Sequence, residues 1–236
     1  MIRTILFDID NTLYDYDRGN EAALRVVCAY CKEHFGWKEE VTFLRQKQAR
    51  KDVEAVIGTN CAASHNRLIR FQRMLEKENL PLEPHVMNLY HGYWDTLIDT
   101  IEPTEDVTSF FRWAKETHRR IGIATNMTAY IQYKKLQKLS VLQDVDFMVT
   151  SEEVGAEKPD PAFFSYCMGK ANCATQECLM IGDSLKGDVL GARNAGLQAL
   201  WLQAYASENE LRAQNGEETA FQSLRACREW IEGQAL

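Results

Sequence analysis

The chain has 236 residues, of which 45% are hydrophobic and 26% charged, with only 5 prolines. This composition is typical of a globular protein and excludes disorder on the scale of a domain, and the length allows either one large domain or a main domain with a smaller partner. A formal net charge of -7 argues against general binding to nucleic acid, but one or two local cations could still hold a small phosphorylated substrate.

The first predicted element is a buried strand over residues 3–9, and two carboxylates stand at its end. Asp8 and Asp10 follow the apolar run "ILF" and are two positions apart. On an extended strand such side chains point to the same side, roughly 5 to 7 Å apart along the strand. The apolar run before Asp8 is too short for a signal peptide or a membrane span, and no later run is long enough to cross a bilayer. We therefore expect no membrane partner.

Residues 16–100 are predicted to be entirely helical, because the segment has no strand-like alternation. Two of its helical patterns end at glycines, Gly36 and Gly58, which favour the left-handed backbone that stops a helix. Two further helices are expected over 64–80 and 84–101.

After Pro103 the pattern changes to strands alternating with helices. The expected strands are 120–126, 145–155 with its loop, 177–184 and 198–202, and the expected helices are 104–118, 128–139, 160–173 and 187–196. This alternation predicts a parallel sheet with helices on both faces, and the strand at 3–9 must join it because one strand cannot stand alone. The predicted fold is therefore an α/β, Rossmann-like core over 1–15 and 101–236. An all-helical cap, 16–100, is inserted after the first strand and is placed to act as a lid over the carboxyl ends of the strands.

Each of four segments of the core brings chemically active side chains to the edge where parallel strands end. The first brings Asp8 and Asp10, the second Thr125 and Asn126, the third leads into Lys158, and the fourth brings Asp183, Ser184 and Asp188. Any one of them has an ordinary explanation as a turn or a solvated strand end. Their combination, in this order, indicates a catalytic site.

These residues resemble the four motifs of the haloacid dehalogenase (HAD) superfamily. "DIDNTL" resembles the first motif, "ATN" the second, Lys158 in "EKPDP" the third and "GDSLKGD" the fourth. The all-helical insertion resembles the C1 cap of that superfamily, and the likeness covers the whole chain. The resemblance implies the fold described above.

Several carboxylates would repel one another in a partly dehydrated cleft, so a divalent cation is needed to keep them ionised together. A site of oxygen ligands that leaves the ion some of its water suits Mg²⁺. The resemblance implies that the Asp8 carboxylate, the Asp10 backbone carbonyl and Asp183 bind the metal directly, with Asp188 binding directly or through water.

The resemblance also implies a mechanism of phosphoryl transfer. Asp8 would attack phosphorus and form an aspartyl-phosphate, and Asp10 would act first as the general acid and then as the general base. Thr125, Lys158 and the backbone amide of Asn126 would stabilise the phosphoryl oxygens. The haloacid dehalogenases themselves lack an Asp at the position of Asp10, so its presence favours phosphoryl transfer.

The sequence "DIDNTLY" resembles the opening of HAD enzymes that act on pyrimidine nucleoside monophosphates. We hypothesise that Asn11 and the cap residues Arg67, Arg70 and His65 contact the leaving group of the substrate. In the alternative, Asn11 only tolerates a tight backbone, and the two arginines, three residues apart, lie on a solvated or salt-bridged helix face. Tyr14 is expected to pack the hinge between cap and core.

The leading prediction is a Mg²⁺-dependent phosphatase of a small phosphorylated metabolite, either a nucleoside monophosphate or a sugar phosphate. Two alternatives remain: a phosphoglucomutase-like phosphoryl transfer, and a non-catalytic phosphate-binding or regulatory module. The odd number of scattered cysteines, 7 in all, indicates free thiols in a reducing, cytoplasmic environment. Nothing in the sequence fixes the oligomeric state.

Overall fold

The computed structural model describes residues 1–205, 211–212 and 219–234. The chain divides into two compact units, a core unit of Met1–Asp15 with Glu102–Leu236 and a cap unit of Tyr16–Ile101. Residues 206–210, 213–218 and 235–236, which belong to the predicted core domain, lie outside the described residues.

The core unit is built on a parallel sheet with strand order β3-β2-β1-β4-β5-β6. Its strands are β1 (Thr4–Phe7), β2 (Arg120–Thr125), β3 (Phe147–Thr150), β4 (Cys178–Gly182), β5 (Gln198–Leu202) and β6 (Ala220–Phe221). Leu6 pairs with Gly122 on one side and with Met180 on the other, so β1 lies at the centre of the sheet. The predicted parallel sheet is confirmed, whereas the short edge strand β6 had no counterpart in the sequence prediction.

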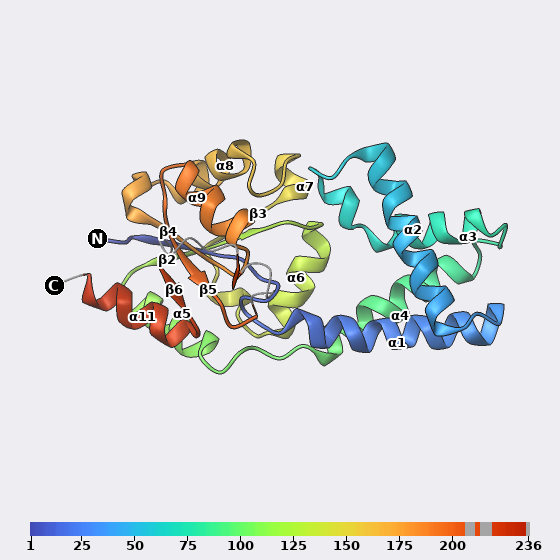
Figure 1. Cartoon of the computed structure of the whole chain (residues 1–236). Coiled ribbons are helices and arrows are strands. Elements are labelled where there is room, and N and C mark those ends of the chain that lie inside the picture. Colours follow the sequence, from blue (N-terminus) through green and yellow to red (C-terminus); the bar gives the residue numbers. More distant parts are fainter. Residues whose placement is uncertain (206–210, 213–218, 235–236) are drawn as a thin grey trace. The chain divides into compact units, whose positions relative to one another are not determined.

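Helices cover both faces of this sheet, as the alternating pattern predicts. They are α5 (Val107–Glu116), α6 (Ala129–Lys138), α7 (Ser151–Val154), α8 (Pro161–Ala171), α9 (Gly191–Asn194) and α11 (Leu224–Gly233), with the shorter turns η2 (Leu142–Asp144), η3 (Thr175–Glu177) and the π-helical η4 (Leu185–Leu190). Helices α5 and α11 lie on one face, and α8 and α9 on the other (Figure 1).

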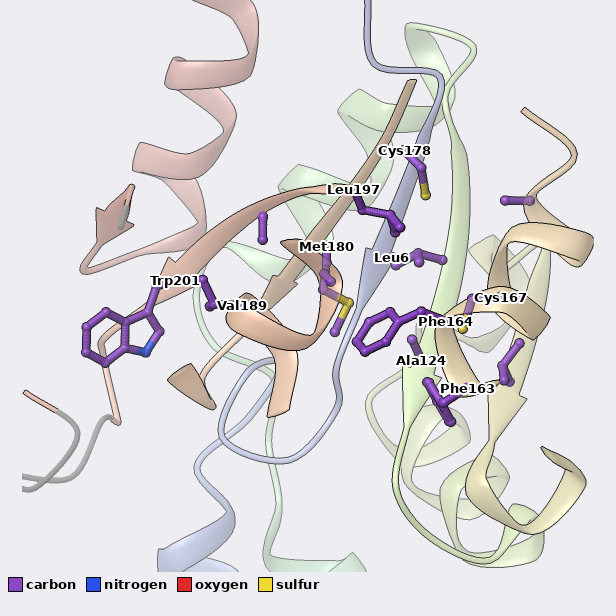
Figure 2. Packing of buried hydrophobic residues seen from close by; sticks show 14 of the residues in the cluster. Leu6, Ala124, Phe163, Phe164, Cys167, Cys178, Met180, Val189, Leu197 and Trp201 are labelled. Atoms are coloured by element: carbon purple, nitrogen blue, oxygen red, sulfur yellow. The ribbon is translucent and has the colours of Figure 1, made fainter. Parts of the chain in front are cut away.

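The hydrophobic core between the sheet and helices α8 and α9 is continuous (Figure 2). All five residues of β4 are buried, as expected for a strand that is covered on both faces and therefore reads as an unbroken apolar run. Phe164 of α8 lies against α9, where a Cβ on Gly191 would approach its ring to 2.7 Å. The glycine therefore allows the close approach of these two helices.

The cap unit is entirely helical, in agreement with the prediction of a helical insertion after the first strand. Its elements are α1 (Tyr16–Phe35), α2 (Glu39–Ile57), η1 (Ala62–His65), α3 (Arg67–Lys77) and α4 (His85–Thr100). Gly36 and Gly58 have φ values of 68° and 79°, which confirms their predicted role in ending α1 and α2. Asn66 begins α3 by accepting a hydrogen bond from the backbone N–H of Leu68 at 2.9 Å.

All 7 cysteines are free thiols. Within the described residues, no helix combines the length and the apolar character that crossing a membrane requires.

Candidate active site

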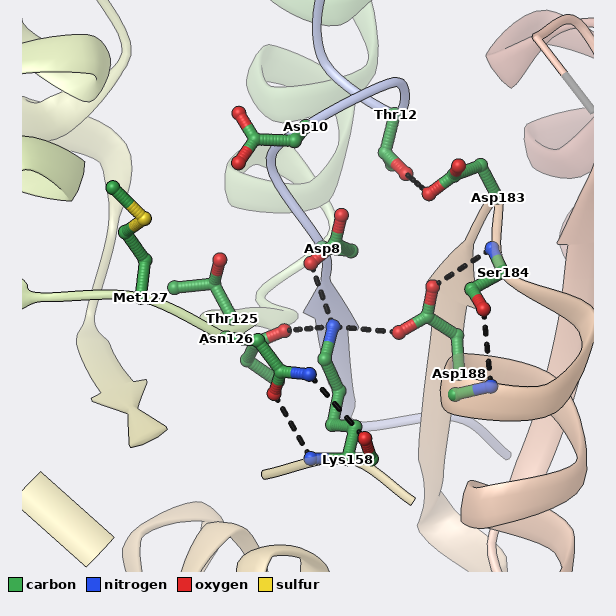
Figure 3. Close-up of polar contacts among 12 residues, drawn as sticks. Asp8, Asp10, Thr12, Thr125, Asn126, Met127, Lys158, Asp183, Ser184 and Asp188 are labelled. Atoms are coloured by element: carbon green, nitrogen blue, oxygen red, sulfur yellow. Dashed lines mark hydrogen bonds and ion pairs between the residues drawn. The ribbon is translucent and has the colours of Figure 1, made fainter. Parts of the chain in front are cut away.

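The side chains singled out at the strand ends of the core converge at one edge of the sheet (Figure 3). Asp8 follows β1, Thr125 is the last residue of β2, and Asp183 follows β4. In a parallel sheet these ends lie on the same side, and this is where open α/β sheets bind ligands. Lys158 reaches the same place from the loop between α7 and α8.

Lys158 is the centre of a buried polar network. Its ammonium donates to Asp8 Oδ1 at 2.6 Å, to Asp188 Oδ1 at 2.6 Å and to the carbonyl of Ala124 at 2.8 Å, and its side chain is only 4% exposed. Burial lowers the pKa of this ammonium, but Asp188 and Asp8 outweigh it, so the net shift is upward. Lys158 therefore carries a positive charge at neutral pH.

Asn126 holds the backbone that carries this lysine. Its Nδ2 donates to the carbonyl of Lys158 at 3.3 Å, and its Oδ1 accepts from the N–H of Lys158 at 2.9 Å. Both hydrogen-bonding ends of the amide are thus used on one residue, which fixes the start of the lysine side chain relative to β2.

Three carboxylates form an acidic cluster beside the lysine. One oxygen each from Asp8, Asp183 and Asp188 can be chosen so that all three lie within 4.8 Å of one another. Asp188 is held by the N–H of Ser184, which donates to its Oδ2 at 3.0 Å, and a Cβ at Gly182 would overlap this carboxylate. The glycine of "GDS" is therefore required for Asp188 to turn back beneath the strand end.

Two acids of this cluster, Asp8 and Asp183, resist ionisation when no metal ion is bound. Burial raises the pKa of Asp8 to about 7, with Lys158 opposing the shift and Asp188 and Asp10 adding to it. Burial, followed by the charges of Asp8 and Asp188, raises the pKa of Asp183 to about 9. A divalent cation would reverse these shifts, and an oxygen-only donor set is the kind that Mg²⁺ prefers.

The Asp10 carboxylate lies outside the Lys158 network (Figure 3). Lys135 of α6 donates to its Oδ1 at 2.7 Å and to its Oδ2 at 2.9 Å, and the hydroxyl of Tyr14 donates to Oδ1. The intervening Asn11 has a φ of 56°, a left-handed conformation that asparagine tolerates better than most residues. This conformation supplies a backbone reason for Asn11, and its contact with substrate stays a prediction.

Sequence reasoning missed two residues of α6 that hold the catalytic candidates. Gln132 is fully buried and its Nε2 donates to Thr125 Oγ1 at 2.6 Å, while Lys135 is fully buried against Asp10. They are three residues apart and share the helix face that also carries the buried Ile131 and Leu136. The signal in the sequence that could have revealed them is a glutamine and a lysine on an apolar helix face, because a buried lysine needs an anionic partner.

The two arginines of the cap have different surroundings. Arg67 Nη2 donates to the hydroxyls of Tyr16 at 3.2 Å and Tyr93 at 3.0 Å, and its guanidinium lies over the Tyr93 ring. Within the described part of the chain, no carboxylate forms an ion pair with Arg67. Arg70 is 7% exposed and donates through Nε to the carbonyl of Ser64 at 2.9 Å.

A profile of the haloacid dehalogenase-like hydrolase family matches residues 5–202, a range that includes every strand end of the site. The chain belongs to this family. The predicted resemblance is thereby confirmed from the first strand to β5.

Curated relatives and solved structures agree with this assignment. The chain is 32% identical over 202 residues to ribulose-1,5-bisphosphate 5-phosphatase of Halopiger xanaduensis, covering 85% of this chain and 84% of that protein. It is 29% identical over 208 residues to pyrimidine 5'-nucleotidase YjjG of Escherichia coli, covering 86% and 87%. The crystal structure of a HAD phosphatase from Thermococcus onnurineus has a TM-score of 0.73 and 21% identity over 98% of each chain, which supports the fold.

Proposed function

We propose that this HAD-family protein is a Mg²⁺-dependent phosphatase that cleaves a small phosphomonoester through an aspartyl-phosphate on Asp8. The protein is a phosphoric monoester hydrolase, since its named relatives within the family are phosphatases and a nucleotidase. The observation that carries the finer proposal is the presence of two carboxylates with different surroundings. Asp8 lies within the Lys158 network, and Asp10 lies outside it with its side chain 29% exposed.

The donor set of the acidic cluster fits Mg²⁺. Asp8 and Asp183 would hold the ion together with the backbone carbonyl of Asp10, and Asp188 would hold it directly or through water. When bound, the ion would offset the negative charge of the carboxylates and of the phosphate dianion that approaches them.

In the first half-reaction, an Asp8 carboxylate oxygen forms a bond to phosphorus while the bond from phosphorus to the leaving oxygen breaks. Asp10 gives a proton to that leaving oxygen, so that an alcohol departs. Lys158 remains charged beside Asp8 and offsets the negative charge that gathers there.

In the second half-reaction, water attacks phosphorus and Asp10 accepts the proton that the water loses. The bond between phosphorus and the Asp8 oxygen breaks, which releases inorganic phosphate and restores the Asp8 carboxylate. One group thus serves as acid and then as base, as microscopic reversibility allows.

Thr125 and the segment around Asn126 would receive the phosphoryl oxygens. Because Gln132 donates to Thr125 Oγ1, the hydroxyl proton of Thr125 remains available to donate to a phosphoryl oxygen. The backbone amide of Asn126 would donate to a second oxygen, from a segment that the contacts with Lys158 hold in place.

For the substrate we propose a soluble sugar phosphate or nucleoside monophosphate, and a cytoplasmic location consistent with the free cysteines. Relatives named for ribulose-1,5-bisphosphate and for pyrimidine nucleotides support both substrate classes. We propose that the cap arginines and Asn11 contact the leaving group. Arg67 is the stronger candidate of the two arginines, because its described hydrogen-bond partners are neutral hydroxyls, whereas Arg70 is bound to the Ser64 carbonyl.

The substrate contact can be tested with Arg67→Met, which removes the charge and keeps most of the aliphatic length. We expect the relative kcat/KM values across a panel of phosphomonoesters to change, with exposed Arg25→Met of α1 as the matched control. Equal losses on every substrate would show that Arg67 serves the cap fold alone.

The proposed reaction is tested by phosphate release from nucleoside monophosphates, sugar phosphates and small phospho-acids, with Mg²⁺ and with EDTA. We expect wild type to release phosphate only with the metal and Asp8→Asn to release none. A sugar phosphate that is isomerised without release of phosphate would favour the mutase alternative.

A further inference from the structure

Lys135 is a fully buried lysine that belongs to none of the four sequence motifs. Its side chain has no exposed area, and it lies on α6, whose first residue comes four positions after Thr125. Taking an ammonium out of water is costly unless an anion and hydrogen bonds replace the lost hydration. The anion that Lys135 contacts is the carboxylate of Asp10, the proposed acid and base, and this ion pair offsets the cost of burying the ammonium.

The contacts fix the orientation of the Asp10 carboxylate. Lys135 lies 2.7 Å from Oδ1 and 2.9 Å from Oδ2, so it bridges both oxygens. The hydroxyl of Tyr14 donates to Oδ1 as well, and the Lys135 ammonium lies 5.9 Å from the centre of the Tyr14 ring. Tyr14 is itself fully buried, which anchors this triangle of side chains in the core unit.

The two oxygens of Asp10 are not equivalent. Oδ1 accepts two hydrogen bonds and has both lone pairs occupied, whereas Oδ2 accepts one among the described contacts. The oxygen with a lone pair to spare is the one that can exchange a proton with substrate or water. When Oδ2 carries a proton, Oδ1 still keeps its two donors, so the orientation is maintained in both half-reactions.

We propose that Lys135, assisted by Tyr14, is the positioning residue that holds Asp10 so that its Oδ2 transfers the proton in both half-reactions. This inference rests on the proposed phosphatase mechanism. A residue of this kind affects the proton transfer and leaves the attack of Asp8 on phosphorus unaffected. Its removal should therefore matter most where the leaving oxygen needs a proton.

The test compares two substrates of nearly equal shape, phenyl phosphate and p-nitrophenyl phosphate, in the presence of Mg²⁺. Phenolate is a poor leaving group, since phenol has a pKa near 10, whereas nitrophenolate departs without a proton. For Lys135→Met we expect kcat/KM on phenyl phosphate to fall about 10- to 100-fold, because positioned general acid catalysis contributes on this scale. On p-nitrophenyl phosphate kcat/KM should fall less than about threefold, because kcat/KM reports the step in which the leaving group departs.

A second readout concerns the hydrolysis of the aspartyl-phosphate, in which Asp10 acts as the base for either substrate. With p-nitrophenyl phosphate, Lys135→Met should lower kcat and produce a burst of nitrophenolate followed by slow turnover. Lys134→Met, an exposed lysine on the same helix, is the matched control and should behave as wild type. Lys135→Arg, which restores a cation, should recover part of the loss on phenyl phosphate.

Tyr14→Phe keeps the ring and removes the hydroxyl, and it should show the same preference between substrates at smaller size. This variant decides the matter if Lys135→Met does not fold. If wild type is active, equal losses of kcat/KM on both substrates in the variants, or no loss on either substrate, would overturn the role of Lys135. A wild type that releases phosphate from neither substrate with Mg²⁺ would instead overturn the proposed function.

Discussion

Replacing Asp183 with Asn should stabilise the metal-free protein and abolish its response to Mg²⁺. One carboxylate oxygen from each of the three acids of the cluster lies within 4.8 Å of the other two. At an effective dielectric constant of about 20, two unit charges at that distance repel by about 3.5 kcal/mol. Asp183 avoids part of this repulsion by holding a proton, and Lys158 offsets another part. We therefore expect the free energy of unfolding to rise by about 1 to 3 kcal/mol at pH 8 in EDTA.

The substitution keeps the shape of the side chain and an oxygen that can accept from Thr12 Oγ1, which lies 3.4 Å from Asp183 Oδ1. Urea unfolding followed by tryptophan fluorescence gives the comparison, in EDTA and in Mg²⁺. Wild type should gain about 2.7 kcal/mol when Mg²⁺ is present at 100 times its Kd, and Asp183→Asn should gain almost nothing. Asp99→Asn, an exposed acid in α4, is the matched control and should match wild type in both conditions.

A loss of stability in EDTA would refute the repulsion argument, because it would mean that the carboxylate makes net favourable contacts in the metal-free protein. A full gain from Mg²⁺ in Asp183→Asn would show that this residue does not hold the metal. Either result would contradict the assignment of the acidic cluster as a set of mutually repelling carboxylates that hold the metal.

The pKa values of Asp8, about 7, and Asp183, about 9, lie above the ordinary value near 4, so the folded metal-free protein binds protons more tightly. Its stability in EDTA should be greatest below about pH 4 on this account and fall as pH rises through 7 and 9, and urea midpoints that rise from pH 5 to pH 8 would contradict this sign. Lys158→Met should lower the free energy of unfolding by about 3 kcal/mol or more at pH 8 and kcat by at least about 100-fold, because two buried carboxylates lose their cation. A variant that kept the wild-type free energy of unfolding or the wild-type kcat would refute the central place of Lys158 in the network. Gln132→Leu should lower kcat about tenfold with little change in KM, since Thr125 Oγ1 loses its donor, and a change confined to KM would argue against that role.

The fold could be predicted from the sequence because its patterns are local. Buried parallel strands such as β4 appear as short apolar runs, and glycines such as Gly36 and Gly58 mark helix ends. The strand β6 escaped prediction because it has only two residues and its pairing with β5 comes from tertiary packing. Its position in the sheet cannot be deduced from periodicity over so short a segment.

The candidate site could be predicted where its residues stand at strand ends or in the loops that follow them. Asp8, Thr125 and Asp183 were identified at the ends of β1, β2 and β4, and Lys158 in the loop between α7 and α8 that follows β3. Lys135 lies about 1.7 turns into helix α6, and its partner Asp10 is 125 residues away in the chain. No spacing rule joins two such positions, so only the packing of α6 against the loop after β1 reveals the pair.

In the proposed mechanism Asp8 carries the phosphoryl group during turnover. The most direct measurement is acid quenching of Asp10→Asn during reaction with p-nitrophenyl phosphate and Mg²⁺, followed by mass analysis of the peptide that contains the first strand. Because the variant lacks the base that activates water, we expect the aspartyl-phosphate to accumulate on Asp8 and to be absent when Asp8 is also replaced by Asn. Turnover of p-nitrophenyl phosphate by Asp10→Asn with no phosphoryl group on Asp8 at any quench time would contradict the account.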